Sequence, residues 1–206
     1  MQLSSNIPVL SIQDESRLFM KLDYDASELI TYAQNNITCE ESNNYIAHDS
    51  NIENYNIIKK IKRDVFAEYP MQSGWCYGKG TKMNGVEWHN SFEVCVACTD
   101  CCLILGDYFD IENDTYDSSK AICLKLNKGD VVRLNPLTLH LAPLNTSNEF
   151  KVAILLPMGT NSPLKDGIDG TLRMVNKWLL VHPENTKGIS LGGKIGVIGD
   201  NISVIK

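Results

Sequence analysis

The stretch NGVEWHNSFEVCVACTDCCLILGD carries two different kinds of metal-ligating side chain. Its first part holds Glu87, His89 and Glu93, and the part that follows Glu93 holds four cysteines. Glu87 and His89 are two residues apart, so in a β-strand both side chains point to the same face of the sheet. Glu93 follows four residues later, across a bend. Either part could bind a metal ion, so the spacing of each set has to be judged separately.

A second histidine completes the first set. His140 lies in GDVVRLNPLTLHLAP, at the end of a strand that we expect to start after the turn at Gly129. A lone histidine on a strand is usually a hydrogen-bonded structural residue, but two imidazoles and two carboxylates on one sheet face would hold Mn, Fe, Co, Ni or Zn. We therefore predict Glu87, His89, Glu93 and His140 as metal ligands. Whichever of Glu87 and Glu93 is not fixed on the metal would be the catalytic acid–base group.

The cysteines fit a metal site less well. Cys95, Cys98, Cys101 and Cys102 have no second pair at zinc-knuckle distance, and their spacing differs from that of ferredoxins. Cysteine is also a common buried residue in strands, so we predict core packing for the cluster. Cys95 shares a strand face with Glu93 and is expected to line a ligand cavity. The odd total of seven cysteines suggests free thiols in a reducing cytoplasm.

The elements that must position these residues are predominantly β-strands. After Pro70, short apolar or β-branched runs alternate with Gly, Asn and Asp turns about every 8–12 residues, which is typical of an antiparallel sandwich or barrel. Before it, ASELITYAQNN and NYNIIKKIKRDVFAEY show helical spacing of apolar residues. We therefore predict a helical or mixed N-terminal extension over residues 1–69, packed on a β-barrel with C-terminal strands over residues 70–206.

Composition narrows the class of partner. The net charge of -6 argues against nucleic acid or an anionic membrane as the main partner. No run approaches the roughly 18 apolar residues of a membrane span, and the first residues lack the basic and apolar regions of a signal peptide. The expected protein is cytoplasmic and acts on a small molecule.

The two histidine segments resemble the paired motifs of the cupin superfamily. In that resemblance Glu87 stands where the first motif has its first histidine, His89 and Glu93 match the second histidine and the glutamate, and Gly129 and His140 match the second motif. The resemblance implies a mainly β fold, the cupin double-stranded β-helix or jelly roll, here with N-terminal helices. It also implies a divalent transition metal, and a homodimer is the expectation at the level of the fold.

The phrases MQSGWCYG, EWHNSFEVCVACTD, TLHLAP, LLPMGTN and NKWLLVHPE resemble a bacterial cupin-like family of unknown function, found near sugar-utilisation genes. Some sugar isomerases, including D-lyxose isomerase, are also cupins. The resemblance implies an aldose–ketose isomerase or epimerase that works through an enediolate on an open-chain sugar, including anionic sugars or sugar acids. Alternatives are a sugar-binding cupin without catalysis, a metal-dependent lyase of a small hydroxy acid and an iron-dependent oxygenase.

Four further residues are candidates for substrate contact. Lys79 lies in a glycine-bearing loop before the first motif and could reach an anionic group, although a solvated turn lysine is the ordinary alternative. Arg133, if it points inward, would bind a carboxylate, phosphate or sulfonate. Trp75 and Tyr77 alternate on one strand and could form an apolar cavity wall or part of the core.

Overall fold

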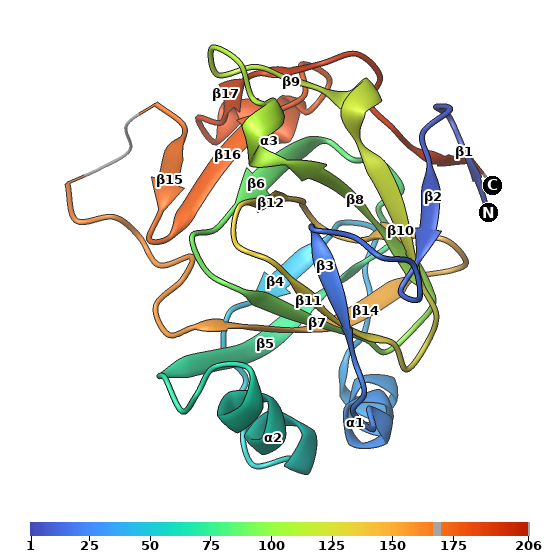
Figure 1. Cartoon of the computed structure of the whole chain (residues 1–206), viewed down its shortest axis with the longest axis vertical. Helices are drawn as coiled ribbons and strands as arrows, with labels where there is room; N and C mark the ends of the chain where they lie inside the picture. The colour runs from blue at the N-terminus through green and yellow to red at the C-terminus, as the bar shows by residue number, and fades with distance from the viewer. Residues whose placement is uncertain (167–169, 206) are drawn as a thin grey trace.

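The computed structural model describes residues 1–166 and 170–205. Its larger sheet forms one wall of a barrel (Figure 1). Neighbouring strands in this six-stranded sheet run in the order β3 (Phe19–Leu22), β11 (Val131–Leu134), β7 (Glu93–Ala97), β14 (Phe150–Pro157), β5 (Met71–Gly78) and β4 (Asn44–Ile46). All of its strand pairs are antiparallel.

A second set of strands faces this sheet. β8 (Cys101–Asp107) pairs with β10 (Ile122–Leu126), β12 (Thr138–Leu139) and β13 (Leu144–Asn145), and β10 pairs with β2 (Val9–Ser11). An isolated bridge between Glu87 and His140 joins β6 (Gly85–Trp88) to the end of β12. The barrel strands therefore have the spatial orders β5-β14-β7-β11 and β6-β12-β8-β10. This is the double-sheet jelly roll to which cupins belong, and it confirms the predicted fold class.

The C-terminal segment adds a smaller sheet beside β6. Strand β16 (Lys177–Val181) pairs with β6, with β15 (Leu172–Met174) and with β17 (Lys194–Ile195). Short pairs join β18 (Val197–Ile198) to β9 (Tyr116–Asp117), and β19 (Val204–Ile205) to β1 (Gln2–Leu3). The two ends of the chain consequently lie side by side (Figure 1). The short helical elements are α3 (Thr186–Ser190) and the 3-10 turns η1 (Tyr108–Asp110) and η2 (Ser118–Lys120).

Two helices lie below the larger sheet (Figure 1). Both were predicted: α1 spans Ser27–Asn36 and α2 spans Asn56–Asp64. The second is shorter than its apolar pattern suggests, because Ala67 and Glu68 adopt positive φ angles that end the helix. Residues 1–69 also supply four strands that pair with strands from the rest of the chain, so this segment forms part of the sheets as well as packing on them. Across the described residues, none of the helices has the length and apolar content that crossing a bilayer requires.

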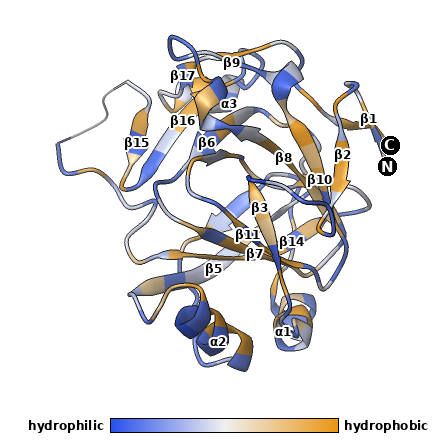
Figure 2. Ribbon diagram, viewed as in Figure 1, coloured by the Kyte–Doolittle hydropathy of each residue, from blue (hydrophilic) through white to orange (hydrophobic). Residues whose placement is uncertain are grey.

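The core divides into three layers. Figure 2 shows hydrophobic colour along barrel strands such as β10 and β14, and mixed hydrophilic and hydrophobic colour on helices α1 and α2. The first layer fills the barrel between the two sheets and includes Leu103, Leu124 and Phe150. The second lies between the helices and the larger sheet, and the third lies between the β8 sheet and the C-terminal strands. Strand β7 shows the alternation clearly, since Cys95 belongs to the first layer and Val94 to the second. Glu93 therefore points into the barrel.

Candidate metal centre

Backbone pairing brings the two predicted motifs together. The N–H of His140 donates to the carbonyl of Glu87 (2.9 Å), and the N–H of Glu87 donates to the carbonyl of His140 (2.5 Å). One step along the ladder, the N–H of Leu137 donates to the carbonyl of His89 (2.9 Å). Glu93 starts the neighbouring strand β7 of the facing sheet. Glu93 and His140, 47 positions apart in the sequence, thus meet inside the barrel, and the bridge between β6 and the end of β12 brings Glu87 to the same place.

The four predicted ligands converge. The Nε2 atoms of His140 and His89 lie 3.2 Å and 3.4 Å from the same atom, Glu93 Oε2. Glu87 Oε1 is farther away, 4.0 Å from His140 Nε2 and 3.8 Å from His89 Nε2. Donor atoms of Glu87, His89 and His140 also all lie within 4.8 Å of one another. Ligands of one transition metal ion are spaced in this range when each bond is about 2.0–2.2 Å long.

Both imidazoles are oriented by backbone carbonyls. His89 Nδ1–H donates to the carbonyl of Asn176 (2.6 Å), and His140 Nδ1–H donates to the carbonyl of Thr138 (2.9 Å). A carbonyl only accepts, so each Nδ1 carries a proton and each Nε2 faces the shared centre, as in histidines that bind metals. His89 Nε2 is buried without a hydrogen-bond partner. This orphaned nitrogen is the observation that best fits a metal ion at the centre.

Charge is concentrated in this buried site. Burial alone would lower the pKa of His140, but the charges of Glu93 and Glu87 raise it to about 9. Burial would raise the pKa of Glu93, but His140 and His89 hold it well below its usual range. For Glu87, burial is likewise outweighed, here by Lys177 and the two histidines, and its pKa is lowered. A metal ion that binds both imidazoles must therefore displace a proton from His140.

The site opens into a cavity of about 330 Å³. Its lining combines the charged residues of the centre with an apolar wall and three neutral polar groups: Tyr45, Cys76, Glu87, Glu93, His140, Leu141, Ala142, Ile154, Asn161, Met174 and Lys177. The Asn161 amide donates to the Tyr45 hydroxyl (3.1 Å), and burial raises the pKa of this tyrosine to about 12, although 42% of the whole residue is exposed. Burial also raises the pKa of the Cys76 thiol. Tyr45 and Cys76 are therefore neutral at physiological pH.

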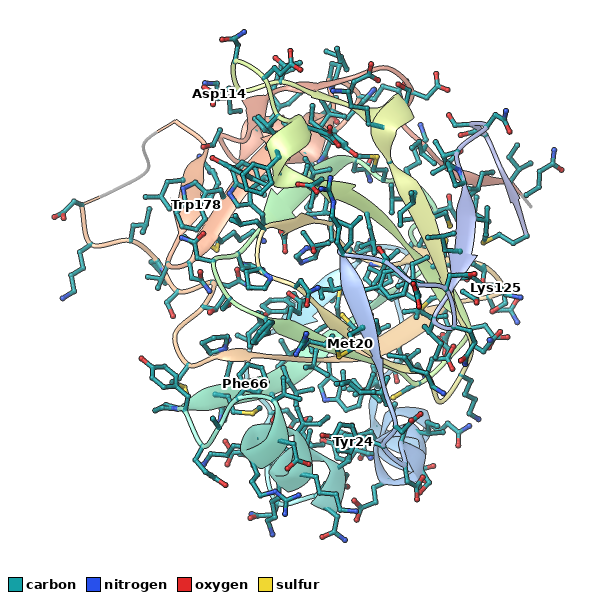
Figure 3. All side chains as sticks on the ribbon, viewed as in Figure 1. Met20, Tyr24, Phe66, Asp114, Lys125 and Trp178 are labelled. Carbon is teal, nitrogen blue, oxygen red and sulfur yellow. The ribbon has the colours of Figure 1, made fainter. Side chains whose placement is uncertain are left out.

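Lys177 is a charged residue of the cavity that the sequence prediction missed. Its ammonium forms an ion pair with Glu87 Oε2, and only 18% of its side chain is exposed. In the β6–β16 ladder Leu179 is paired with Glu87, so Lys177 lies on the same sheet face and diagonally across from the glutamate. Trp178, the next residue of β16, is labelled in Figure 3. The sequence gives no local signal for the pair, because its partners are 90 positions apart in the printed sequence.

Of the two roles predicted for Trp75 and Tyr77, the structure supports core packing and corrects the cavity wall, since neither residue lines the cavity. On β5 it is Cys76 that points into the barrel, so its two neighbours face the helices. The Trp75 ring stacks on Tyr32 with centroids 5.7 Å apart, and its Nε1–H donates to Asp49 Oδ2 (2.9 Å). The prediction that Trp75 and Tyr77 share one face of the strand was correct. The prediction that this face points into the barrel was wrong.

The two predicted cations are also not brought to the cavity. Lys79 pairs with Glu41 at the surface (2.7 Å). Arg133 is opposite Val94 in the β11–β7 ladder, which places it on the face that points away from the cavity. There its guanidinium lies 4.3 Å from the centroid of the Phe92 ring. Neither residue is among those that line the cavity.

The cysteine cluster packs in the core, as predicted. Cys95 and Cys101 belong to the barrel interior, Cys98 to the layer under the helices and Cys102 to the layer behind β8. Alternation therefore spreads the thiols over opposite faces, and in the part of the chain that the structure describes no cysteine joins a group that could hold a metal. Cys95 does not line the cavity; its thiol donates to Glu93 Oε1 (3.4 Å) from below.

Three solved structures are similar to this chain at low identity. A cupin-like protein from Thermotoga maritima is 12% identical with a TM-score of 0.34, covering 59% of this chain and 71% of that one. Salicylate 1,2-dioxygenase from Pseudoaminobacter salicylatoxidans is 7% identical with a TM-score of 0.33, covering 63% and 29%. Oxalate decarboxylase from Bacillus subtilis, described with Mn(II) centres, is 13% identical with a TM-score of 0.32, covering 46% and 23%. The chain thus spans less than a third of the dioxygenase and the decarboxylase, and likenesses at this level carry no information on its reaction.

No curated protein is similar enough to count as a match. The model of one protein family, described as "Domain of unknown function (DUF4867)", matches residues 17–202. That range contains both histidine motifs, the β15–β16 hairpin and every residue that lines the cavity. The chain therefore belongs to the DUF4867 family.

Proposed function

We propose that the protein is a metal-dependent enzyme that moves a proton between adjacent carbons of a small open-chain sugar, as an aldose–ketose isomerase or epimerase. The observation that carries the proposal is that one cavity contains both a group of side chains that could bind a metal ion and a separate carboxylate that could transfer a proton. The Nε2 atoms of two imidazoles and one carboxylate point at a common centre, and a second carboxylate beside them lines the same cavity.

The two glutamates have different surroundings, which supports different roles. Glu93 Oε2 is within 3.4 Å of both Nε2 atoms, so Glu93 is the carboxylate that would hold the ion together with His89 and His140. A divalent ion bound there would polarise a substrate carbonyl as a Lewis acid. Glu87 is farther from both imidazoles and already has a counter-charge in Lys177. It is the spare carboxylate that proton transfer requires.

In this proposal Glu87 takes the proton from the carbon next to the substrate carbonyl, exchanges it with solvent and delivers a proton to the neighbouring carbon, while the proton of the substrate hydroxyl passes to the carbonyl oxygen. The carboxylate acts first as general base and then as general acid, so no other reagent is consumed. The lowered pKa of Glu87 keeps it ionised and ready to accept the proton. The cavity suits an open-chain sugar, because the polar groups of Tyr45 and Asn161 lie among apolar side chains.

The test is proton exchange with solvent. Metal-loaded protein is incubated in D2O with a panel of aldoses, ketoses and sugar acids, and products are examined by NMR. Conversion of a sugar with one solvent deuterium at the carbon next to the carbonyl supports the proposal. The Glu87→Gln variant should lose about 10²–10⁴ in rate while retaining its metal, since that is the usual contribution of a general base. Turnover without solvent deuterium, or full activity of Glu87→Gln, would contradict it.

A further inference from the structure

The ion pair between Lys177 and Glu87 raises a question about the metal centre. Glu87 Oε1 lies 3.8 Å and 4.0 Å from the two imidazole Nε2 atoms, close enough to share one ion with them. A carboxylate at this distance is an obvious fourth protein ligand for a dication. Its other oxygen, however, is held by the ammonium of Lys177. We propose that Lys177 is a positioning residue that holds Glu87 off the metal and so keeps it free to act as the base.

The position of Lys177 is itself fixed. The preceding residue, Asn176, accepts from His89 Nδ1–H through its carbonyl (2.6 Å) and donates through its amide to Ser91 Oγ (2.9 Å) and Thr160 Oγ1 (3.1 Å). Its side-chain oxygen accepts from the N–H of Asn90 (3.0 Å). Asn176 has a φ of 56°, a left-handed conformation that asparagine tolerates better than most residues. The turn before Lys177 is therefore anchored to the loop that carries His89.

Charge and burial allow the Lys177 ammonium to compete with a metal ion for the Glu87 carboxylate. Glu87 is 11% exposed and Lys177 18% exposed at their side chains, so water screens their attraction weakly. Among the described residues that line the cavity, Lys177 is the only lysine or arginine. Its removal would leave the metal ion as the strongest positive charge within reach of Glu87. This inference rests on the proposed function, because it assumes the metal centre at His89, His140 and Glu93.

The test measures metal binding and needs no substrate. Metal-free protein and its Lys177→Met variant are titrated with Co²⁺, and both the affinity and the visible absorption are recorded. We expect the variant to bind Co²⁺ about tenfold more tightly, within the range usual for coupled sites. We also expect weaker visible bands, because cobalt absorbs less as it gains a ligand. Lys177→Gln should behave like Lys177→Met, and Lys177→Arg should resemble the parent protein.

A double-mutant cycle separates competition for Glu87 from simple repulsion between the ammonium and the ion. In a Glu87→Gln background, Lys177→Met should change the affinity by less than about twofold, since the amide has no charge for which to compete. Lys194, which pairs with Asp114 outside the cavity (2.5 Å), supplies the control variant Lys194→Met with unchanged binding.

Three outcomes would overturn the inference, and they are distinguishable. Unchanged affinity and spectrum in Lys177→Met would show that Glu87 does not move to the metal. Equal tightening with and without Glu87 would show that Lys177 acts only through space. Absence of Co²⁺ binding by the parent protein would overturn this inference and the proposed function together, whereas a tighter Lys177→Met variant in a protein that exchanges no solvent deuterium would refute the proposed function alone.

Discussion

Replacing His140 by alanine should destabilise the metal-free protein strongly. His140 is 3% exposed, and its Nε2 donates to Glu93 Oε2 at 3.2 Å. With its pKa raised to about 9, the imidazole is protonated at pH 7 and forms a buried ion pair with Glu93. The variant leaves a buried carboxylate without its nearest counter-charge, which is among the more costly single changes that a core can undergo.

The size of the effect follows from the geometry. At 3.2 Å and an effective dielectric constant near 20, the attraction is about 5 kcal/mol before the cost of burying the charges. Removal of one partner of a buried pair usually costs about 3–5 kcal/mol. The lower end of that range, about 3 kcal/mol, is the smallest loss expected for His140→Ala. For a chain of this size that corresponds to a Tm lower by about 6–12 °C.

Thermal unfolding followed by circular dichroism in excess chelator measures this loss. A cycle with Glu93→Gln isolates the pair, because the double variant should cost clearly less than the sum of the two single variants. A Tm that falls by less than about 2 °C, or single effects that simply add, would refute the ion pair as the source of stability.

Three further predictions concern residues in and around the site. The stability that His140 adds to the metal-free protein is fully present below its ordinary pKa of 6.5 and is lost as the pH rises through about 9; urea titrations across this window should show the loss, and a His140→Gln variant should lack it. Co²⁺ should bind more tightly as the pH rises over the same window, with a proton released on binding that calorimetry in two buffers can count. Trp75→Phe should lower the free energy of unfolding by about 1–3 kcal/mol through its lost bond to Asp49, while the metal content stays that of the parent; a loss of metal would contradict the placement of this ring under the helices.

Local alternation was enough to predict which residues of one strand act together. Glu87 on β6 and His89 just after it point to the same side, and Glu93 and Cys95 share a face of β7, as their spacing indicated. His140 could be added because its spacing after Gly129 matched a known motif, and the ladder between β6 and the end of β12 then brought it within reach. These inferences depend on period and order, which a sequence displays directly.

The sequence pattern could not predict which face of a strand points into the barrel, nor which distant strand it pairs with. Alternation showed that Trp75 and Tyr77 share a face of β5, but both faces of that strand are buried, so the pattern could not tell the barrel interior from the helical layer. Lys177 was missed for a different reason. Its position depends on the pairing of β16 with β6, which joins segments far apart in the chain.

Metal analysis tests the central claim most directly. Protein reconstituted with Mn²⁺, Fe²⁺, Co²⁺, Ni²⁺ or Zn²⁺ and freed of excess ion is examined by elemental analysis and by anomalous diffraction. We predict one ion per chain, placed between His89 Nε2, His140 Nε2 and Glu93 Oε2, and its loss in the His89→Ala/His140→Ala double variant. Folded parent protein that retains no ion, or a double variant that retains a full equivalent, would contradict the account.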